Sequence, residues 1–312
     1  MVDKDRYSAS QLFNFVQGSY FERTSQPIYA IVFLLPFIVF YELGTILINT
    51  DLLRHYWQGR VVAFSWVQEF LAHIGFGSKF AWAATPLAVV VILIALQLTS
   101  RKRWRFRFGD ILPMAVECIL LAVPLIVLSM FLSGSGQRQG DINEFANSAV
   151  QIEADTVLSC SSVANDGSPA PLLPSEEGKG AEDSSDEGKW QGLLANIVTG
   201  IGAGIYEELI FRLILIIGLM MLFQDVLRLD HKSSIILSVL ISAALFSAYH
   251  HIVYLEGRFI QSTPFNWTEF GFRTIAGIYF AVLFAIRGFG ITAGAHAFYD
   301  IIAVSMNALF IR

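Results

Sequence analysis

Apolar residues are gathered into long blocks along this chain, and short polar segments separate the blocks. A helix needs roughly 20 mostly apolar residues to cross a bilayer, and several blocks reach that length. The blocks cover residues 28–49, 79–98, 111–132, 191–223, 234–253, 269–287 and 290–310. No alternating pattern of a β-barrel is visible, so helices are expected to satisfy the backbone within lipid. The pattern predicts an all-α polytopic membrane protein with about seven transmembrane helices.

Two further segments mix apolar and polar residues. Residues 61–76, VVAFSWVQEFLAHIGF, are short and polar for a span, and we expect a helix that lies on or partly in the membrane. If this segment does cross, the number of spans becomes eight. Residues 7–26 predict an interfacial amphipathic helix within an N-terminal tail, residues 1–27.

Composition agrees with a membrane protein. The 312 residues are 54% hydrophobic and 15% charged, whereas soluble domains carry about a quarter charged residues. The net charge of −5 comes largely from one loop, and we expect no nucleic-acid partner. Two cysteines provide no disulfide framework.

Charge and complexity divide the chain. The positive-inside rule places the basic segment RKRWRFRFGD, which starts at Arg101, in the cytoplasm. We expect the N-terminus to lie in the cytoplasm as well. Residues 134–189 are acidic and of low complexity, so we expect a disordered extracytoplasmic loop. This loop separates N-terminal transmembrane helices, residues 28–133, from a C-terminal core, residues 190–312. We expect an integral, multi-pass protein of a bacterial inner (plasma) membrane, in contact with the lipid bilayer.

Ionisable residues occur inside the apolar blocks of the C-terminal core. They are Glu207, Glu208 and Arg212 in the fourth block, His250 and His251 at the end of the fifth, Arg273 near the start of the sixth, and His296 and Asp300 in the seventh. Charged groups inside membrane helices are costly and by default mark function.

Helical spacing orders these groups. Glu208 and Arg212 are four residues apart and can pair on one face, as can His296 and Asp300, whereas Glu207 points about 100° away from Glu208. The glycines of GIGAG, residues 200–204, allow another helix to approach closely. An ionisable residue that stands alone in an apolar block can have a structural role. We expect such a role for His251, and for the isolated acids Glu42 and Glu117 of the N-terminal helices. The coincidence of the other ionisable residues on three helices predicts a polar cavity within the membrane.

The cavity has the groups for hydrolysis. A glutamate beside a neutral histidine can polarise a water molecule, and the water then attacks a carbonyl. The chain has neither H-E-x-x-H nor G-x-S-x-G, which argues against a standard zincin and against a serine hydrolase. We expect no cofactor, although a zinc site formed by His250, His296 and Glu207 is geometrically open.

The motifs resemble a known family. EELIFR (Glu207, Glu208, Arg212) resembles EExxxR, FSAYH (Phe246, His250) resembles FxxxH, and HAFYD (His296, Asp300) resembles HxxxN/D. The three occur in this order in the CAAX-protease and bacteriocin-processing family, also called the ABI family. These are intramembrane glutamate proteases that include the Ras-converting CAAX endopeptidase, and they have also been classed as metalloendopeptidases.

The resemblance implies a role for each residue. Glu207 would activate water together with His250, Glu208 would pair with Arg212, and His296 and Asp300 would stabilise the oxyanion. Eukaryotic-type members are expected to have Asn where this chain has Asp300, and an ionised aspartate would repel an oxyanion. Asp300 would therefore be protonated, or would orient His296 instead.

Three functions compete at this point. The first is an intramembrane endopeptidase that hydrolyses a peptide bond of a membrane-associated protein or peptide. The second is a proton-coupled transporter that uses the same carboxylates and histidines as a relay. The third is a non-catalytic immunity or scaffold protein. The sequence favours the first.

Overall fold

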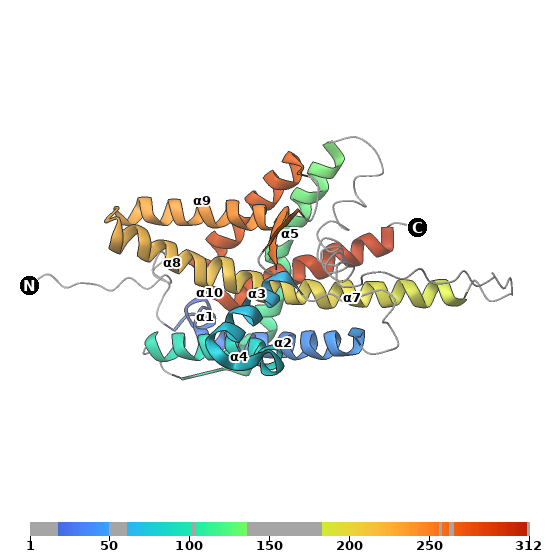
Figure 1. Ribbon diagram of the computed structural model, residues 1–312, viewed down its shortest axis with the longest axis horizontal. Coiled ribbons are helices and arrows are strands. Elements are labelled where there is room, and N and C mark those ends of the chain that lie inside the picture. Colours follow the sequence, from blue (N-terminus) through green and yellow to red (C-terminus); the bar gives the residue numbers. More distant parts are fainter. Residues whose placement is uncertain are drawn as a thin grey trace, which may run out of the picture.

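The computed structural model describes residues 18–49, 61–100, 104–135, 183–255, 258–261 and 265–310, and these residues are mainly helical (Figure 1). Six helices are long and apolar enough to cross a membrane. They are α2 (Pro27–Asn49), α4 (Gly77–Ser100), α5 (Ile111–Ser135), a continuous helix from α7 to η5, α9 (His231–Tyr249) and α10 (Trp267–Phe310). The chain is an integral, multi-pass membrane protein, as its apolar blocks predict.

Helix α10 accounts for two of the seven predicted spans. Its 44 residues are interrupted at Gly288, whose backbone has φ 75° and ψ 179°, and the two parts correspond to the predicted segments 269–287 and 290–310. The fourth predicted span also has internal structure. It consists of α7 (Asp183–Glu208), the π-helix η4 (Leu209–Leu215), α8 (Ile216–Met221) and a second π-helix η5 (Leu222–Val226).

Several predicted boundaries differ from the structure. Helix α7 begins at Asp183, inside the predicted loop 134–189, because DSSDE is a favourable helix start; residues 136–182 lie outside the described part. Of the predicted interfacial helix 7–26, the structure describes residues 18–26, and they contain the short helix α1 (Tyr20–Thr24). The segment 61–76 is helical, as α3 (Val62–Leu71) and η2 (Ala72–Phe76), and is not a candidate span.

A small hairpin follows α9 and was not predicted. Strands β1 (Ile252–Leu255) and β2 (Arg258–Gln261) pair in antiparallel fashion between α9 and α10. The fifth predicted span, 234–253, therefore ends early: α9 stops at Tyr249, and His250 and His251 lie in the turn that leads to the hairpin. The β-branched and aromatic residues of this segment favour an extended backbone as readily as the end of an apolar helix.

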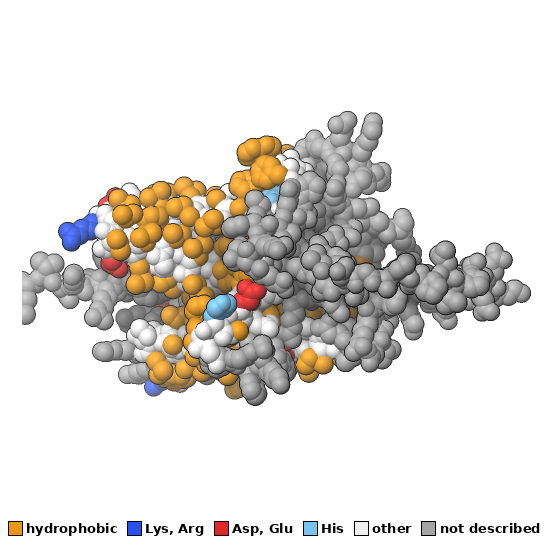
Figure 2. All heavy atoms as spheres, viewed as in Figure 1, with side chains coloured by type: hydrophobic (Ala, Val, Ile, Leu, Met, Phe, Trp, Pro, Cys, Tyr) orange, Lys and Arg blue, Asp and Glu red, His pale blue; other side chains and the backbone are white. Residues whose placement is uncertain are grey.

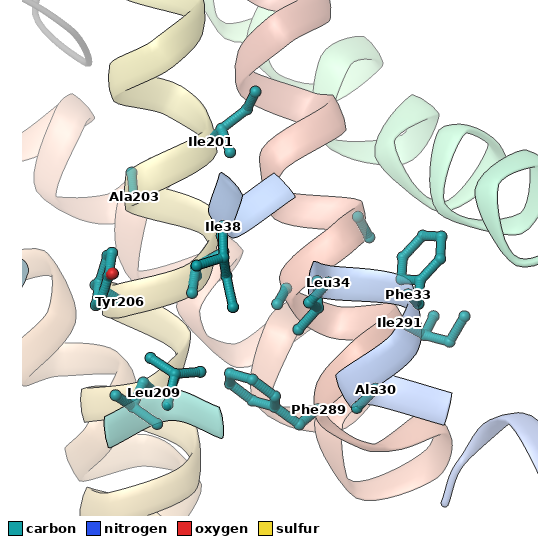
Figure 3. Close-up of a cluster of buried hydrophobic side chains, with 14 of the residues drawn as sticks. Ala30, Phe33, Leu34, Ile38, Ile201, Ala203, Tyr206, Leu209, Phe289 and Ile291 are labelled. Carbon is teal, nitrogen blue, oxygen red and sulfur yellow. The ribbon is translucent and has the colours of Figure 1, made fainter. Parts of the chain in front are cut away.

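Helix α10 is central in the packing, since it contacts α2, α5, α7 and α9. The main hydrophobic cluster lies where α2, α7 and α10 meet, and Figure 3 shows Leu34 and Ile38 of α2 between Ile201 of α7 and Ile291 of α10. Many large apolar side chains outside this cluster are exposed, for example over α8 and α9 (Figure 2). Such a surface suits contact with lipid.

A polar cluster fastens α1 and α5 to the break in α10. Arg287, the residue before Gly288, makes five hydrogen bonds. They go to both carboxylate oxygens of Glu117, to Thr24, to Ser25 and to the main-chain carbonyl of Phe21. Tyr20 also donates to Glu117 at 2.8 Å, and burial together with this hydrogen bond raises the pKa of Tyr20. Glu117 is therefore a structural acid, as expected.

We expect the variant Arg287→Ala to lower the free energy of unfolding by about 3–5 kcal/mol, because it leaves the Glu117 carboxylate without its partner. Thermal or denaturant unfolding in detergent micelles measures this change. Arg105→Ala is the matched control, since Arg105 is exposed. Equal stability of the two variants would contradict a structural role for the cluster.

Candidate active site

Two adjacent acids lie at the junction of α7 and η4. Glu207 and Glu208 are the last residues of α7, and both are buried. The π-helix η4 follows directly, and the hydroxyl of Ser242 on α9 donates to the main-chain carbonyl of Phe211 within it at 2.6 Å. π-helical turns inside α-helices occur frequently at functional sites, where they change the direction of nearby side chains.

Two glycines of GIGAG bring α7 close to the second part of α10. A Cβ atom on Gly204 would lie 2.6 Å from the backbone nitrogen of Ala297, and one on Gly200 would lie 2.6 Å from Cβ of Asp300. The expected close approach of another helix is thus present, and the helix is the one that carries His296 and Asp300. The glycines allow the acids of α7 and the histidine of α10 to meet.

Gly204→Val is expected to separate α7 from α10 and to reduce any activity of this site at least about 100-fold, because small displacements of reacting groups cost that much. The enlarged side chain would meet backbone, which cannot move aside as a flexible side chain can. Gly218→Val, on α8 with nothing within 4 Å of its added Cβ, is the control. Catalytic rates of the two variants at equal amounts of folded protein provide the measurement.

Glu208 is the centre of a buried charged cluster. Its Oε1 accepts a hydrogen bond from Nδ1 of His296 at 2.7 Å, and its Oε2 lies 3.2 Å from Nε of Arg212. Phe246 lies 4.1 Å from the Arg212 guanidinium, and the ring of Phe280 stacks on His296 at 4.6 Å. One carboxylate therefore orients both the arginine and the histidine.

The guanidinium of Arg212 depends on this carboxylate for its charge balance. Arg212 is fully buried, and none of its three guanidinium nitrogens makes a hydrogen bond within the described residues. The contact with Glu208 is an ion pair without hydrogen-bond geometry, and Phe246 adds a cation–π contact. Removal of Glu208 would leave an uncompensated charge in the protein interior.

Glu207 faces the other histidine. Its Oε1 lies 3.9 Å from Nε2 of His250, which is beyond direct hydrogen-bond distance. His250 is the C-cap of α9, and its Nδ1 donates to the carbonyl of Phe246 at 2.8 Å. With Nδ1 carrying the proton, Nε2 of a neutral His250 is an acceptor that points toward Glu207.

Asp300 completes the polar cavity from one helical turn beyond His296. Its Oδ2 lies 3.6 Å from Nε2 of His296, so the imidazole ring lies between the carboxylates of Glu208 and Asp300. The role of Asp300 in orienting His296 stays a prediction.

The structure brings all six predicted site residues together from α7, η4, the end of α9 and α10. Sequence reasoning missed Phe280, which stacks on His296, because a phenylalanine in an apolar block gives no signal of a specific contact. It also placed His250 within a helix, whereas the residue ends the helix. The rings of Phe246 and His250, the two residues of the FxxxH motif, are in contact, with centroids 4.9 Å apart.

Among the described residues, no group of three or more His, Cys, Asp or Glu residues is placed so that it could hold a metal ion. The alternative zinc ligands His250, His296 and Glu207 are thus not arranged as a metal site in this structure.

A known family matches the part of the chain that holds the site. Residues 189–302 match the family described as type II CAAX prenyl endopeptidase Rce1-like. The chain matches the Rce1-like CAAX endopeptidases over this region. The matched residues include all six site residues, and the match confirms the resemblance to the CAAX-protease family. No curated protein and no solved structure matched the chain.

This match favours the first of the three functions, an endopeptidase of the CAAX type. The matched region corresponds closely to the C-terminal core expected at residues 190–312. Helices α2, α3, α4 and α5, with the α1 segment, lie outside the match.

Proposed function

We propose that this protein is an intramembrane endopeptidase in which Glu207 and His250 activate a water molecule. The separation of these two side chains supports the proposal most directly. Two acceptors that each lie about 2.8 Å from one water are roughly 4 to 5 Å apart. The observed 3.9 Å between Glu207 and His250 is close to this separation.

The attack on the peptide bond begins with that water. Glu207 takes a proton from it as general base, while Nε2 of His250 accepts the second hydrogen bond and directs the oxygen lone pair at the carbonyl carbon. The Nδ1 hydrogen bond to Phe246 supports this role, because it leaves Nε2 unprotonated. A new C–O bond forms, and the carbonyl oxygen becomes an oxyanion.

His296 is the proposed electrophile. The Nδ1–H group of His296 donates to the Glu208 carboxylate. When the ring is an imidazolium, Nε2 also carries a proton and can donate to the oxyanion. The flanking carboxylates of Glu208 and Asp300 balance the charge of that imidazolium, and Phe280 fixes the plane of the ring. The C–N bond then breaks, and the proton held by Glu207 passes to the leaving nitrogen.

The substrate class follows from the family match. A CAAX sequence is the last four residues of a protein and is prenylated on its cysteine. We propose a prenylated, membrane-associated protein as substrate, cleaved near its carboxyl end. The lipid-facing surface of α8 and α9 and the membrane location of the site suit a substrate that reaches the enzyme through the bilayer.

Cleavage of a synthetic peptide tests the proposal. The peptide carries a farnesylated cysteine followed by three residues, and the purified protein is reconstituted into liposomes. We expect mass spectrometry to show a shortened lipid-bearing product and a short carboxyl-terminal product. A water nucleophile activated by Glu207 and His250 needs no metal, so the rate should be unchanged after incubation with a zinc chelator. No product under these conditions would count against an endopeptidase, and loss of activity with chelator would count against this mechanism.

A further inference from the structure

Three arginines in the C-terminal core are buried, and they differ in how many of their donors are used. Arg287 makes five hydrogen bonds, one for each N–H group, as befits a structural residue. Arg273, near the start of α10, makes one within the described part of the chain, from NH1 to Glu269 at 3.1 Å. Both residues of this pair are more than nine-tenths buried. Among the residues that the structure describes, the other four N–H donors of Arg273 make no hydrogen bond.

Arg273 lies where α9 and α10 pack together beside the candidate site. Ser247 of α9 donates to the carbonyl of Phe270 at 2.8 Å, and Gly277 lies against Ala243, so Arg273 is located between these two contact points. The stretch of α9 between these contact points, from Ala243 to Ser247, also holds Phe246 of the candidate site. This arginine thus belongs to the surroundings of the site without contacting the residues that the mechanism uses.

The distance along α10 suits a short peptide. Arg273 and Phe280 are seven residues apart, which is two turns and about 10 Å on one helix face. Phe280 stacks on His296, the proposed oxyanion donor. Within a CAAX sequence the scissile bond is at most three residues from the terminal carboxylate, and three extended residues also span about 10 Å. The spacing between Arg273 and Phe280 along α10 therefore matches the length from the scissile bond of a CAAX sequence to its terminal carboxylate.

We propose that Arg273 binds the terminal carboxylate of the substrate and makes the enzyme specific for bonds close to a free carboxyl end. The proposal rests on the endopeptidase function proposed above. An arginine can bind a carboxylate through two parallel hydrogen bonds, and Glu269 holds one edge of the guanidinium while leaving the other donors unused. The acids of the site, Glu207, Glu208 and Asp300, would repel the terminal carboxylate of a substrate. A cation such as Arg273 is therefore needed to bind that carboxylate.

Two substrates that differ only at the last group test the proposal. One is the farnesylated peptide with a free carboxylate, and the other is the same peptide as the carboxamide. For the unaltered protein we expect kcat/KM to favour the carboxylate by about tenfold to 100-fold, the range for charge-assisted hydrogen bonds. In Arg273→Gln the preference should fall to near one, chiefly through a lower kcat/KM for the carboxylate. Because both peptides are measured on the same preparation, the ratio of their kcat/KM values does not depend on the fraction of the protein that is folded.

The controls separate this proposal from the proposed function. Arg105→Gln, at an exposed position, should keep the full preference, and Arg273→Lys should keep part of it, because a charge remains without the two-donor geometry. Equal cleavage of both peptides by the unaltered protein would overturn the carboxylate site while leaving the endopeptidase intact. An equal loss on both peptides in Arg273→Gln would show that Arg273 and Glu269 are only a structural pair. Failure to cleave either peptide would overturn the endopeptidase itself.

Discussion

Replacement of Glu207 by glutamine should lower kcat/KM for peptide cleavage by about 10²- to 10⁴-fold, the usual contribution of a general base. Glutamine has nearly the same shape and can still bind the water, but it cannot take the proton. Glu207 makes no direct hydrogen bond to His250 at 3.9 Å, so stability should change little. Initial rates in proteoliposomes and thermal unfolding in detergent measure the two quantities on the same preparation.

Glu69→Gln is the matched control for this change, since Glu69 is an exposed acid on α3. It should leave the rate within about twofold of the unaltered protein, because surface substitutions have small effects. Full peptide cleavage by Glu207→Gln would remove Glu207 from the mechanism. If the unaltered protein cleaves nothing and instead moves protons in liposomes, the relay function would be favoured.

The helices and the site residues could be predicted because each leaves a local signal. Apolar blocks of roughly 20 residues mark spans whatever their partners are. Ionisable residues such as Glu208 and His296 stand out in those blocks because lipid excludes them unless they have a use. The spacing of Glu208 and Arg212 predicted their ion pair, and the glycines of residues 200–204 predicted the close helix approach that unites the site.

Other features depend on contacts between distant segments, and these leave no local signal. The break of α10 at Gly288 and the five hydrogen bonds of Arg287 depend on α1 and α5, far away in the sequence. A glycine within an apolar block does not reveal whether its backbone is helical. The hairpin after α9 was missed for a related reason, since its apolar residues continue the hydrophobic block of the helix.

The position of His250 shows how a small boundary error affects chemistry. The sequence predicted a helix through residue 253, which would give His250 a place on a helix face. At the C-cap, its Nδ1 reaches the Phe246 carbonyl, and that contact decides which ring nitrogen faces Glu207. Hydrogen-bond partners of this kind become visible only once helix ends are placed to within one residue.

Glu208→Gln is expected to lower the free energy of unfolding by about 3–5 kcal/mol, as much as Arg287→Ala, and to reduce activity as well. The change leaves the fully buried Arg212 guanidinium without the one counter-charge that contacts it among the described residues. Activity should also fall, by about 100-fold, because His296 loses the charged acceptor of its 2.7 Å hydrogen bond. Unfolding in detergent and peptide cleavage measure the two losses separately.

The double variant Glu208→Gln/Arg212→Met separates the two roles of Glu208. Methionine fills much of the space between Phe246 and Phe280 without a charge, so stability should return to near the original value, as it often does when a buried ion pair is replaced by apolar groups. Activity should stay low, since the loss at His296 remains. Recovery of both would mean that Glu208 serves only to neutralise Arg212, whereas recovery of neither would mean that Arg212 itself is needed to hold the cavity together. The expected result, a stable but inactive protein, would assign Glu208 to the orientation of His296.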